Sequence, residues 1–357
     1  MNVLLTGATG FLGQYLLLEL IRRGHTVWAL YRNEEKRAQT TRFVTGLIES
    51  RKDESLHWIR GDVLRIHEMW DGLRRDHPSL DDVDTVLHCA ASVRFKENDL
   101  GDPTRTNVGS ARSIKSLVER GGIQAHIVST AYVCGLVRGE IVREVLHPDP
   151  SFLNVYERSK WEAEQIWGGN ATILRPSIIV GDSKSGRCVS FTGWYIAVKA
   201  LHKLDQVFGR GDSSARRSFR LDVPADPGAT SNVVPVDYVA EAAIRIVENP
   251  LNHNRIFHLT HPDPPTHQWS LEVLCKRFNI TGLRLLWTNA DASKPSNEVI
   301  RMLQEQTKPV LSYFENNPIF DRTNVAQALP DLHVPSLDEE MFNKLIAYAI
   351  KTNWGKP

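Results

Sequence analysis

Short apolar runs alternate with helical patterns through the first half of the chain. The runs that read as strands are residues 3–5, 26–32, 56–62, 85–92, 125–133 and 171–180. Helical patterns separate them, and the first extends from Phe11 to Arg23 and ends at Gly24. Strands separated by helices form βαβ units and a parallel sheet, whose strands are buried on both faces and are therefore apolar throughout. The pattern predicts an α/β fold with a doubly wound parallel sheet.

The pattern changes after residue 181. Residues 182–193 and 209–231 are rich in Gly, Ser, Pro and charged residues, which is typical of loops. Asp237 then precedes a helical pattern, and aspartate is a residue type that caps helices. One more apolar run, residues 255–260, reads as a strand that rejoins the sheet.

Composition and charge narrow the class of protein. The 357 residues are 41% hydrophobic and 24% charged, as in globular proteins generally. Lys and Arg number 43 against 42 Asp and Glu, which argues against a general nucleic-acid or membrane-surface binder. The four cysteines lie far apart without a CxxC pair, which fits a reducing cytosol better than a disulfide framework or a zinc site. The longest apolar run near the N-terminus is far short of the ~20 residues of a membrane span. We therefore predict a cytoplasmic protein with no membrane span.

A glycine-rich turn, TGATGFLG, lies between the first predicted strand and the first predicted helix. Gly7 permits a tight turn, Gly10 lets a pyrophosphate approach the backbone, and Gly13 lets the helix pack close to the sheet. An anion there faces the free N–H groups and the positive end of the helix dipole. Because the motif occurs between a strand and a helix, we predict a dinucleotide site on a Rossmann-type sheet. The alternative is a glycine turn that binds nothing.

The end of the second predicted strand indicates which dinucleotide binds. An acidic residue there holds the ribose 2′-hydroxyl of NAD, whereas an arginine accommodates the 2′-phosphate of NADP. This chain has Arg32 at the strand end, and we predict NADP(H). Glu34 and Glu35 follow it, and the alternative is that these charges only solvate the next helix.

A Tyr-x-x-x-Lys pair supplies candidate acid–base chemistry. Tyr156 and Lys160 are four residues apart and share one face if the segment is helical. A nearby ammonium group lowers the pKa of a tyrosine from ~10 and suits proton transfer to or from a carbonyl oxygen. Ser129 and Thr130 stand at the end of a predicted strand, where sites form in parallel sheets. On its own, the Tyr–Lys spacing also fits a surface helix pair.

Taken in order, these motifs resemble those of the extended short-chain dehydrogenase/reductase superfamily. The segments GDV, HCAAS, RPSIIVG and VPVDYVA match as well, so the resemblance covers residues 1–260. It implies that Thr130 takes the place of the catalytic Ser/Thr and that Tyr156 donates the proton. Lys160 would bind the nicotinamide ribose and lower the pKa of Tyr156. Asn107 matches a recurring asparagine, which we interpret as structural.

The resemblance also places residues along the cofactor. Asp62 and Val63 would flank the adenine, residues 90–92 would run beside the ribose and phosphates, and residues 176–178 would contact the nicotinamide end. The full set predicted to bind NADP(H) is Gly7, Thr9, Gly10, Phe11, Leu12, Gly13, Arg32, Asp62, Val63, Ala90, Ala91, Ser92, Tyr156, Lys160, Pro176, Ser177 and Ile178.

Within the superfamily, TGATGFLG, HCAASVRF, STAYV, YERSKWEAE and ILRPSIIVGDSKSG resemble the fatty acyl-CoA reductase and carrier-protein thioester reductase branch. The resemblance implies an NADPH-dependent reductase that transfers hydride to an acyl thioester on coenzyme A or an acyl carrier protein. The product is an aldehyde, with reduction to an alcohol left open. The alternatives are an aldehyde or ketone reductase, a sugar-nucleotide epimerase of the same superfamily, and a catalytically silent NADP-binding regulator.

The substrate is expected to bind outside the sheet. We predict that residues 1–181 and 233–262 form the NADP-binding Rossmann core. Residues 182–232 and 263–357 would form a smaller C-terminal substrate-binding subdomain. Four arginines there are candidates for the phosphate or acidic surface of a thioester carrier, with a solvated loop as the alternative. They are Arg210, Arg216, Arg217 and Arg220.

Three other features carry weaker signals. The two histidines of residues 261–267 have no accompanying ligand framework, so no metal site is predicted. Cys134 lies close to the predicted site but lacks a histidine arrangement for nucleophilic chemistry, so we interpret it as a small apolar residue. Trp194 and Tyr195 fit either an apolar substrate pocket or the core.

Overall fold

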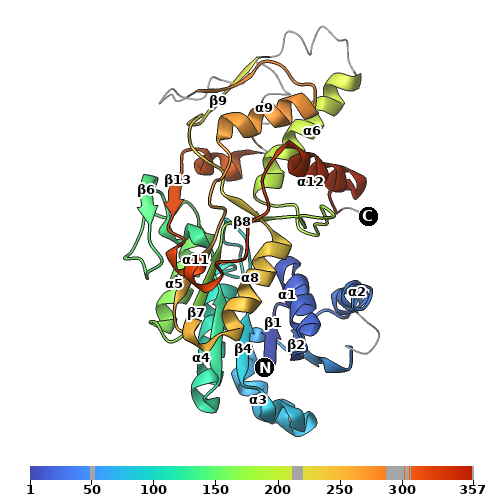
Figure 1. Cartoon of the computed structure of the whole chain (residues 1–357), viewed down its shortest axis with the longest axis vertical. Coiled ribbons are helices and arrows are strands. Elements are labelled where there is room, and N and C mark those ends of the chain that lie inside the picture. Colours follow the sequence, from blue (N-terminus) through green and yellow to red (C-terminus); the bar gives the residue numbers. More distant parts are fainter. Residues whose placement is uncertain (49–52, 211–219, 287–300, 302–304, 306, 356–357) are drawn as a thin grey trace.

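A seven-stranded parallel sheet forms the centre of the molecule (Figure 1). The computed structural model describes residues 1–48, 53–210, 220–286, 301, 305 and 307–355. The strand order is β11-β7-β5-β4-β1-β2-β3, and every adjacent pair is parallel. The strands are β1 (Asn2–Thr6), β2 (Thr26–Tyr31), β3 (Leu56–Arg60), β4 (Thr85–His88), β5 (Gln124–Val128), β7 (Thr172–Pro176) and β11 (Ile256–Leu259).

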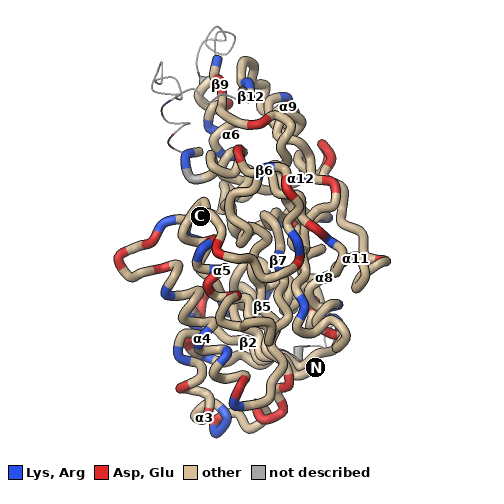
Figure 2. The backbone as a smooth tube through the Cα atoms, turned by 90° about the vertical axis from the view of Figure 1, so that its left-hand side faces the viewer, with Lys and Arg blue, Asp and Glu red and all other residues tan. Residues whose placement is uncertain are grey.

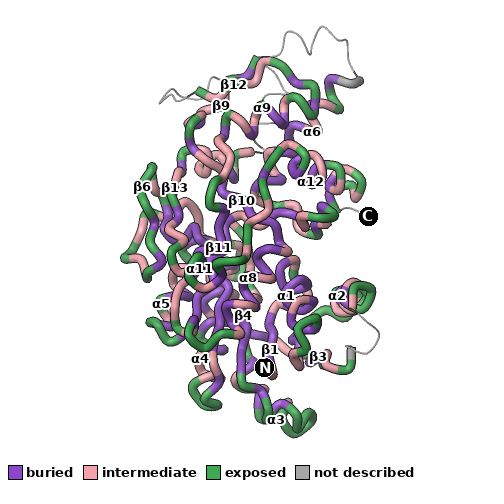
Figure 3. The backbone as a smooth tube through the Cα atoms, in the orientation of Figure 1, coloured by how far each residue is buried: buried purple, intermediate pink, exposed green. Residues whose placement is uncertain are grey.

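Helices cover both faces of this sheet, which is why its central strands are buried. Val3 and Leu5 of β1 pack in one hydrophobic cluster with α1 (Phe11–Arg22) and α8 (Val236–Glu248). Leu4, on the opposite face, packs in a second cluster with the helices of the other side. Figure 3 shows buried strands in the centre and exposed residues on the outer helices. The predicted α/β fold with a doubly wound parallel sheet is confirmed. The remaining helices around the sheet are α2 (Glu34–Thr45), α3 (Ile66–Asp76), α4 (Thr104–Gly121) and α5 (Val155–Trp167).

A second group of elements lies beyond the carboxyl ends of the strands (Figure 1). It has its own hydrophobic cluster, in which Tyr195, Leu204 and Phe342 are buried. Its elements are α6 (Trp194–Arg210), α9 (His267–Arg277), α12 (Glu339–Lys351), and the parallel pair of β9 (Leu221–Pro224) and β12 (Leu283–Leu286). These elements come from the segments predicted to form the substrate-binding subdomain.

Several strands are shorter than the apolar runs predicted. The run 171–180 is two strands, because β7 ends at Pro176 and the chain then leaves the sheet. The Ser177 N–H still donates to Leu259 O at 3.3 Å, whereas the Ile178 N–H donates to Asn232 O at 3.3 Å. The second strand, β8 (Ile178–Val180), pairs with β10 (Val233–Pro235) outside the main sheet. This change of partner opens the sheet at its carboxyl edge.

Asp237 does not cap a helix, and that prediction is wrong. Helix α8 already begins at Val236, with Pro235 before it and no side-chain cap. The Asp237 carboxylate instead accepts hydrogen bonds from the backbone N–H and the hydroxyl of Ser183. It therefore ties the loop after β8 to α8.

Residues 317–328 pack beside the central sheet before the chain enters α12. Strand β13 (Asn317–Phe320) pairs in parallel with β6 (Arg138–Val142). Helix α11 (Thr323–Ala328) follows, and its Val325 packs in the same hydrophobic cluster as β1 and α8. The segment before β13 is thereby held near the carboxyl ends of β5 and β7.

Charge is spread evenly over the molecule. Basic and acidic residues are interspersed along the described chain (Figure 2), in keeping with the near-neutral total. The structure contains no helix, within the residues it describes, that is long and apolar enough to cross a membrane. No cluster of three or more His, Cys, Asp or Glu side chains suited to a metal ion occurs in that same part of the chain.

Candidate active site

A cavity of about 1010 Å³ lies at the carboxyl ends of the central strands. This volume reaches the upper end of the range for a single drug-sized ligand, roughly 300–1,000 Å³, so it can hold part of a dinucleotide and a substrate together. Its lining joins the glycine-rich turn to α5, α6 and α9. The predicted site residues that line it are Gly7, Gly10, Phe11, Leu12, Gly13, Ala91, Thr130, Tyr156, Lys160, Pro176, Ser177 and Ile178.

The glycine-rich turn requires glycine at two positions. Gly7 has a φ of +76°, and a Cβ atom there would lie 2.6 Å from the backbone nitrogen of Ala90. A Cβ atom on Gly13 would lie 2.0 Å from the Gly7 carbonyl oxygen. Gly10 precedes α1, lies exposed at the helix start and donates its N–H to Gly7 O at 2.9 Å. The first turn of α1 is therefore open to an anion, as the motif predicts.

The predicted adenosine-binding residues lie outside the cavity, at the ends of β2 and β3. Arg32 is 67% exposed, and its Nη1 is 4.0 Å from Asp62 Oδ1. Asp62 also caps a short 3₁₀ helix that begins at Val63, by accepting from Leu64 N at 3.0 Å. The other predicted cofactor residues that do not line the cavity are Thr9, Ala90 and Ser92.

The three predicted catalytic residues are brought together on one side of the cavity. Thr130 follows β5 and begins the 3₁₀ helix η4 (Ala131–Cys134), accepting from Tyr132 N at 3.3 Å. Tyr156 and Lys160 lie one turn apart on α5, and both line the cavity. The buried ammonium group of Lys160 donates to Val128 O at 2.7 Å.

Opposing effects act on the Tyr156 hydroxyl. Burial raises its pKa above the ordinary range, and Glu157 and Cys89 add to the rise, whereas a hydrogen bond with Thr130 lowers it. The sequence predicts Lys160 as the group that lowers this pKa. In the structure Thr130 does so, and the Lys160 ammonium is bonded to a backbone carbonyl instead. Burial lowers the pKa of Lys160 itself to about 8.

Asn107 holds the loop after β4 against α5. It is buried, its Oδ1 accepts from Ser92 N at 2.8 Å, and its Nδ2 donates to Ser92 O at 3.0 Å. The same Nδ2 donates to Ser159 Oγ at 2.8 Å. These bonds fit the structural role predicted for Asn107.

Three buried hydroxyl groups line the cavity without a partner among the described residues, and one of them is Ser270 Oγ on α9. The other two, Ser129 Oγ and Ser177 Oγ, follow β5 and β7, on residues that are 4% and 5% exposed. A buried polar atom without a hydrogen bond is costly, so all three are available to a polar ligand. Together with the open glycine turn, Ser129 and Ser177 fit the binding of a nicotinamide dinucleotide.

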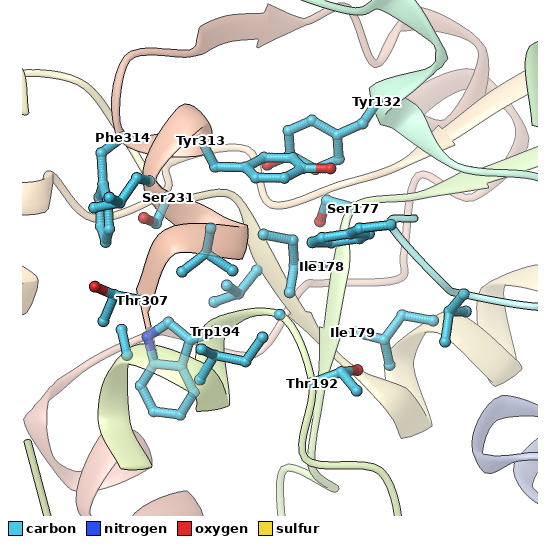
Figure 4. Close-up of a pocket in the computed structure, with 18 of the residues that line it drawn as sticks. Tyr132, Ser177, Ile178, Ile179, Thr192, Trp194, Ser231, Thr307, Tyr313 and Phe314 are labelled. Atoms are coloured by element: carbon cyan, nitrogen blue, oxygen red, sulfur yellow. The ribbon is translucent and has the colours of Figure 1, made fainter. Parts of the chain in front are cut away.

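The other half of the cavity is lined mainly by apolar residues, with polar residues such as Thr192, Ser231 and Thr307 among them. Trp194 lies on the side opposite Tyr132 and Tyr313, with Ile178 between them (Figure 4). Tyr195 is fully buried, and its hydroxyl accepts from Gly181 N at 3.0 Å, so it belongs to the core. Further apolar lining comes from Ala200, Leu201, Val223, Leu271, Leu274, Leu283, Leu285, Val310 and Leu311.

Four residues at the site were not predicted from the sequence. Phe95, Tyr132 and Tyr313 line the cavity beside Tyr156. The Tyr313–Tyr132 and Tyr313–Phe95 ring centroids are 5.3 and 5.8 Å apart. Glu157 lies behind Tyr156, and burial raises its pKa to about 7. Tyr313 belongs to no motif, and the spacing of Asn154 and Glu157 signals only a helix cap.

The weaker sequence signals have different outcomes. Cys134 is buried in a small apolar cluster with Tyr132 and Phe320, as predicted. Arg216, Arg217 and the Arg210 side chain lie outside the described residues.

The fold is a Rossmann-type doubly wound parallel sheet, and Thr130, Tyr156 and Lys160 line one cavity at the carboxyl ends of its strands. The chain belongs to the Male sterility protein family, whose model matches residues 5–243. The family resemblance predicted from the motifs is thereby confirmed.

Relatives in the comparisons are reductases and peptide synthetases. The nonribosomal peptide synthetase asaC of Aspergillus flavus is 26% identical, over 92% of this chain and 34% of that protein. Fatty acyl-CoA reductase 1 of Xenopus laevis is 28% identical, over 68% of this chain and 53% of that protein. The chain therefore spans about a third to a half of these relatives. The terminal R domain of the myxalamid biosynthetic pathway has the same fold, with a TM-score of 0.77, 24% identity, and coverage of 99% of this chain and 91% of that one.

Proposed function

We propose that the chain is an NADPH-dependent reductase of acyl thioesters, carried on coenzyme A or on an acyl carrier protein. One observation carries the proposal: a single cavity joins the glycine-rich turn, the Thr130–Tyr156–Lys160 group and a chamber lined mainly by apolar residues. The apolar chamber suits an acyl chain better than a sugar nucleotide, whose hydroxyl groups need polar partners. The names of the relatives, a fatty acyl-CoA reductase among them, agree with this substrate class.

The residues of the chain act on the carbonyl oxygen of the substrate. A bound nicotinamide cofactor supplies the hydride for the carbonyl carbon. Thr130 and Tyr156 donate hydrogen bonds to the oxygen as it gains negative charge, and each such donor is worth ~2.7–4 kcal/mol in comparable sites. Tyr156 then gives its proton to that oxygen. The single O–H of Thr130 can then donate to the resulting tyrosinate in place of the substrate oxygen, which stabilises the tyrosinate. The hemithioacetal expels the thiol and leaves an aldehyde.

Lys160, Ser129 and Ser177 hold and orient the cofactor in this proposal. The Lys160 ammonium is already fixed by Val128 O, which leaves its other N–H groups for the nicotinamide ribose. The unpartnered hydroxyls of Ser129 and Ser177 are available to the carboxamide and ribose. The division into an NADP-binding core and a substrate-binding subdomain is part of the same proposal.

The charges after β2 support NADP rather than NAD. The acidic residues of α2 are engaged within their own helix: Glu34 pairs with Arg37, and Glu35 accepts from Gln39 at 3.1 Å. Arg32 is the exposed cation at the strand end. A 2′-phosphate would therefore meet Arg32 before it meets a carboxylate of α2.

Arg32→Ala is expected to weaken NADPH binding by about tenfold, the effect of one charge-assisted hydrogen bond to phosphate. Binding of NADH should be unchanged, because NADH lacks that phosphate. Dissociation constants from fluorescence titration measure both. Arg158→Ala is the matched control, since Arg158 is 66% exposed on α5 and pairs with Glu162. A wild-type preference for NADH would contradict the assignment.

The pH dependence of the reaction should report on Lys160. Because its pKa is lowered to about 8, Lys160 is charged below that pH and neutral above it. kcat/KM follows ionisation in the free enzyme, so we expect it to fall as the pH rises through about 8. Lys160→Arg should lower the rate but remove this fall, since a guanidinium stays protonated up to about pH 12. A fall at the same pH in the Lys160→Arg variant would assign it to another group.

The experiment that tests the proposed function is NADPH oxidation with a series of acyl-CoA chain lengths and the matching aldehydes. Consumption with acyl-CoA, and release of free thiol, is the expected result. Turnover of aldehydes alone would favour an aldehyde reductase. No consumption with either class would contradict reductase activity on these substrates.

A further inference from the structure

The hydroxyl of Tyr313 connects a short helix in the last part of the chain to the start of α5, the helix that carries Tyr156 and Lys160. Tyr313 belongs to the 3₁₀ helix η6 (Lys308–Phe314), and its hydroxyl donates to Glu157 Oε1 at 2.5 Å. The hydroxyl oxygen of Tyr313 also accepts a hydrogen bond from Asn154 Nδ2 at 2.8 Å. The bonds connect residues more than 150 positions apart in the sequence. They join the start of α5 directly to the lining of the cavity.

Glu157 does more than cap its own helix. Asn154 caps α5 and accepts from Glu157 N at 3.0 Å, which is the usual arrangement at a helix start. A glutamate in this position normally lies near the surface and binds only its own helix. Here the residue is fully buried, and its three donors are Leu153 N, Asn154 Nδ2 and Tyr313 OH. A buried carboxylate is costly unless its oxygens are hydrogen-bonded, so Glu157 depends on Tyr313 as well as on α5.

The η6 helix forms one side of the cavity next to Tyr156. Val310, Leu311, Tyr313 and Phe314 all line it. The Tyr313 ring contacts Tyr132 and Phe95, and Phe95 lies 6.4 Å from Tyr156, centroid to centroid. In Figure 4, Tyr313 and Tyr132 lie side by side above the apolar chamber, and Phe314 follows Tyr313 at the end of η6. Displacement of η6 would therefore change the space beside the reacting carbonyl.

We propose that Glu157 and Tyr313 form a positioning pair, which holds η6 against the start of α5 and so places the acyl group against Tyr156. The inference rests on the proposed function, since it assumes an acyl substrate in the apolar chamber. Neither residue of the pair takes part in proton transfer. The pair sets the binding of the substrate and leaves the binding of the dinucleotide unchanged, because the glycine-rich turn lies on a different part of the cavity lining.

Tyr313→Phe is the cleaner test, since it removes only the hydroxyl and keeps the ring. We expect the KM for an acyl-CoA to rise by about tenfold, the effect of one hydrogen bond. The kcat and the NADPH dissociation constant should stay within about twofold. Tyr348→Phe is the matched control, because Tyr348 lies on α12 and does not line the cavity. A lower melting temperature with an unchanged KM would mean a purely structural bond and would overturn the proposal.

Glu157→Gln tests the other member. The carboxylate accepts through Oε1 from Tyr313 and Asn154, and through Oε2 from Leu153 N. An amide has only one oxygen, so the variant no longer offers separate acceptor oxygens to the Tyr313 hydroxyl and to Leu153 N. We expect the KM to rise as in Tyr313→Phe, and the double variant to show no greater rise than the larger single one. Additive increases in KM would show that the residues act independently and would overturn the pair.

Hydrogen–deuterium exchange gives a readout that does not need turnover. Tyr313→Phe should speed exchange in peptides that cover residues 308–316, and Tyr348→Phe should not. Unchanged exchange would overturn the proposal even if the KM changes. If none of the acyl thioesters supports NADPH oxidation by the wild-type chain, the proposed function itself is overturned. If the wild type reduces an acyl thioester and the variants keep its KM and its exchange rates, the positioning pair is overturned and the proposed function is not.

Discussion

Tyr156→Phe is expected to lower kcat/KM for the acyl substrate by at least about 10³-fold. The variant removes both the proton donor, typically worth about 10²–10⁴-fold, and one hydrogen bond to the oxyanion. The ring remains, so the packing around it and the NADPH dissociation constant should change by less than about threefold. Steady-state kinetics with acyl-CoA and fluorescence titration of NADPH measure the two quantities separately.

The matched control for this variant is again Tyr348→Phe, which removes a tyrosine hydroxyl away from the cavity. Thr130→Ala adds a second comparison, because Thr130 both bonds to Tyr156 and lines the cavity. Its loss should cost about 10²-fold or more, with NADPH binding retained. Full activity in Tyr156→Phe would contradict the proton-donor role. Loss of NADPH binding in that variant would show that it disrupts the site instead.

The parts of the fold that follow local rules could be predicted from the sequence. The strands of a parallel sheet are buried on both faces, so residues such as Val3, Leu4 and Leu5 have to be apolar together. The glycine-rich turn was predictable because the positions of Gly7 and Gly13 leave no room for a Cβ atom. Such constraints act between residues close in sequence or fixed by the sheet, and they leave recognisable motifs.

The ends of the strands could not be predicted in the same way. An apolar run does not show where hydrogen bonding to the sheet stops. At Ser177 the chain changes partner from β11 to the segment before β10, and nothing in the run 171–180 marks that change. The error at Asp237 has a similar cause, since its partner Ser183 comes from a distant loop. Aspartate at a helix start fits both a cap and a tertiary contact.

The individual residues that the last part of the chain contributes to the site were also beyond prediction. Tyr313 reaches Glu157 through tertiary structure alone, and each residue is ordinary in its local sequence. The pattern of Asn154 and Glu157 indicates a helix start, which is correct but incomplete. Glu157 differs from an ordinary capping residue because its carboxylate is buried and bonded to Tyr313. The burial of a residue depends on the whole fold.

Gly13→Ala is expected to weaken NADPH binding by at least about a hundredfold. Its Cβ atom would lie 2.0 Å from the Gly7 carbonyl oxygen, so either α1 or the turn must move. Both belong to the proposed binding site, in which the turn and the first N–H groups of α1 would together receive the pyrophosphate. The neighbours of Gly13 are backbone atoms, which cannot rotate away as a side chain can. The dissociation constant of NADPH, measured by calorimetry, checks the prediction.

The same substitution should also lower the free energy of unfolding, by about 1–3 kcal/mol, as overpacking at a close contact does. Gly72→Ala is the matched control. Gly72 lies within α3, and its nearest neighbour to a new Cβ atom is Arg75 Nη2 at 3.9 Å. Since alanine favours helix over glycine by about 0.8–1.0 kcal/mol, this control should keep or raise stability and bind NADPH normally. Equal NADPH binding by the two variants would show that the contact between Gly13 and Gly7 does not shape the cofactor site.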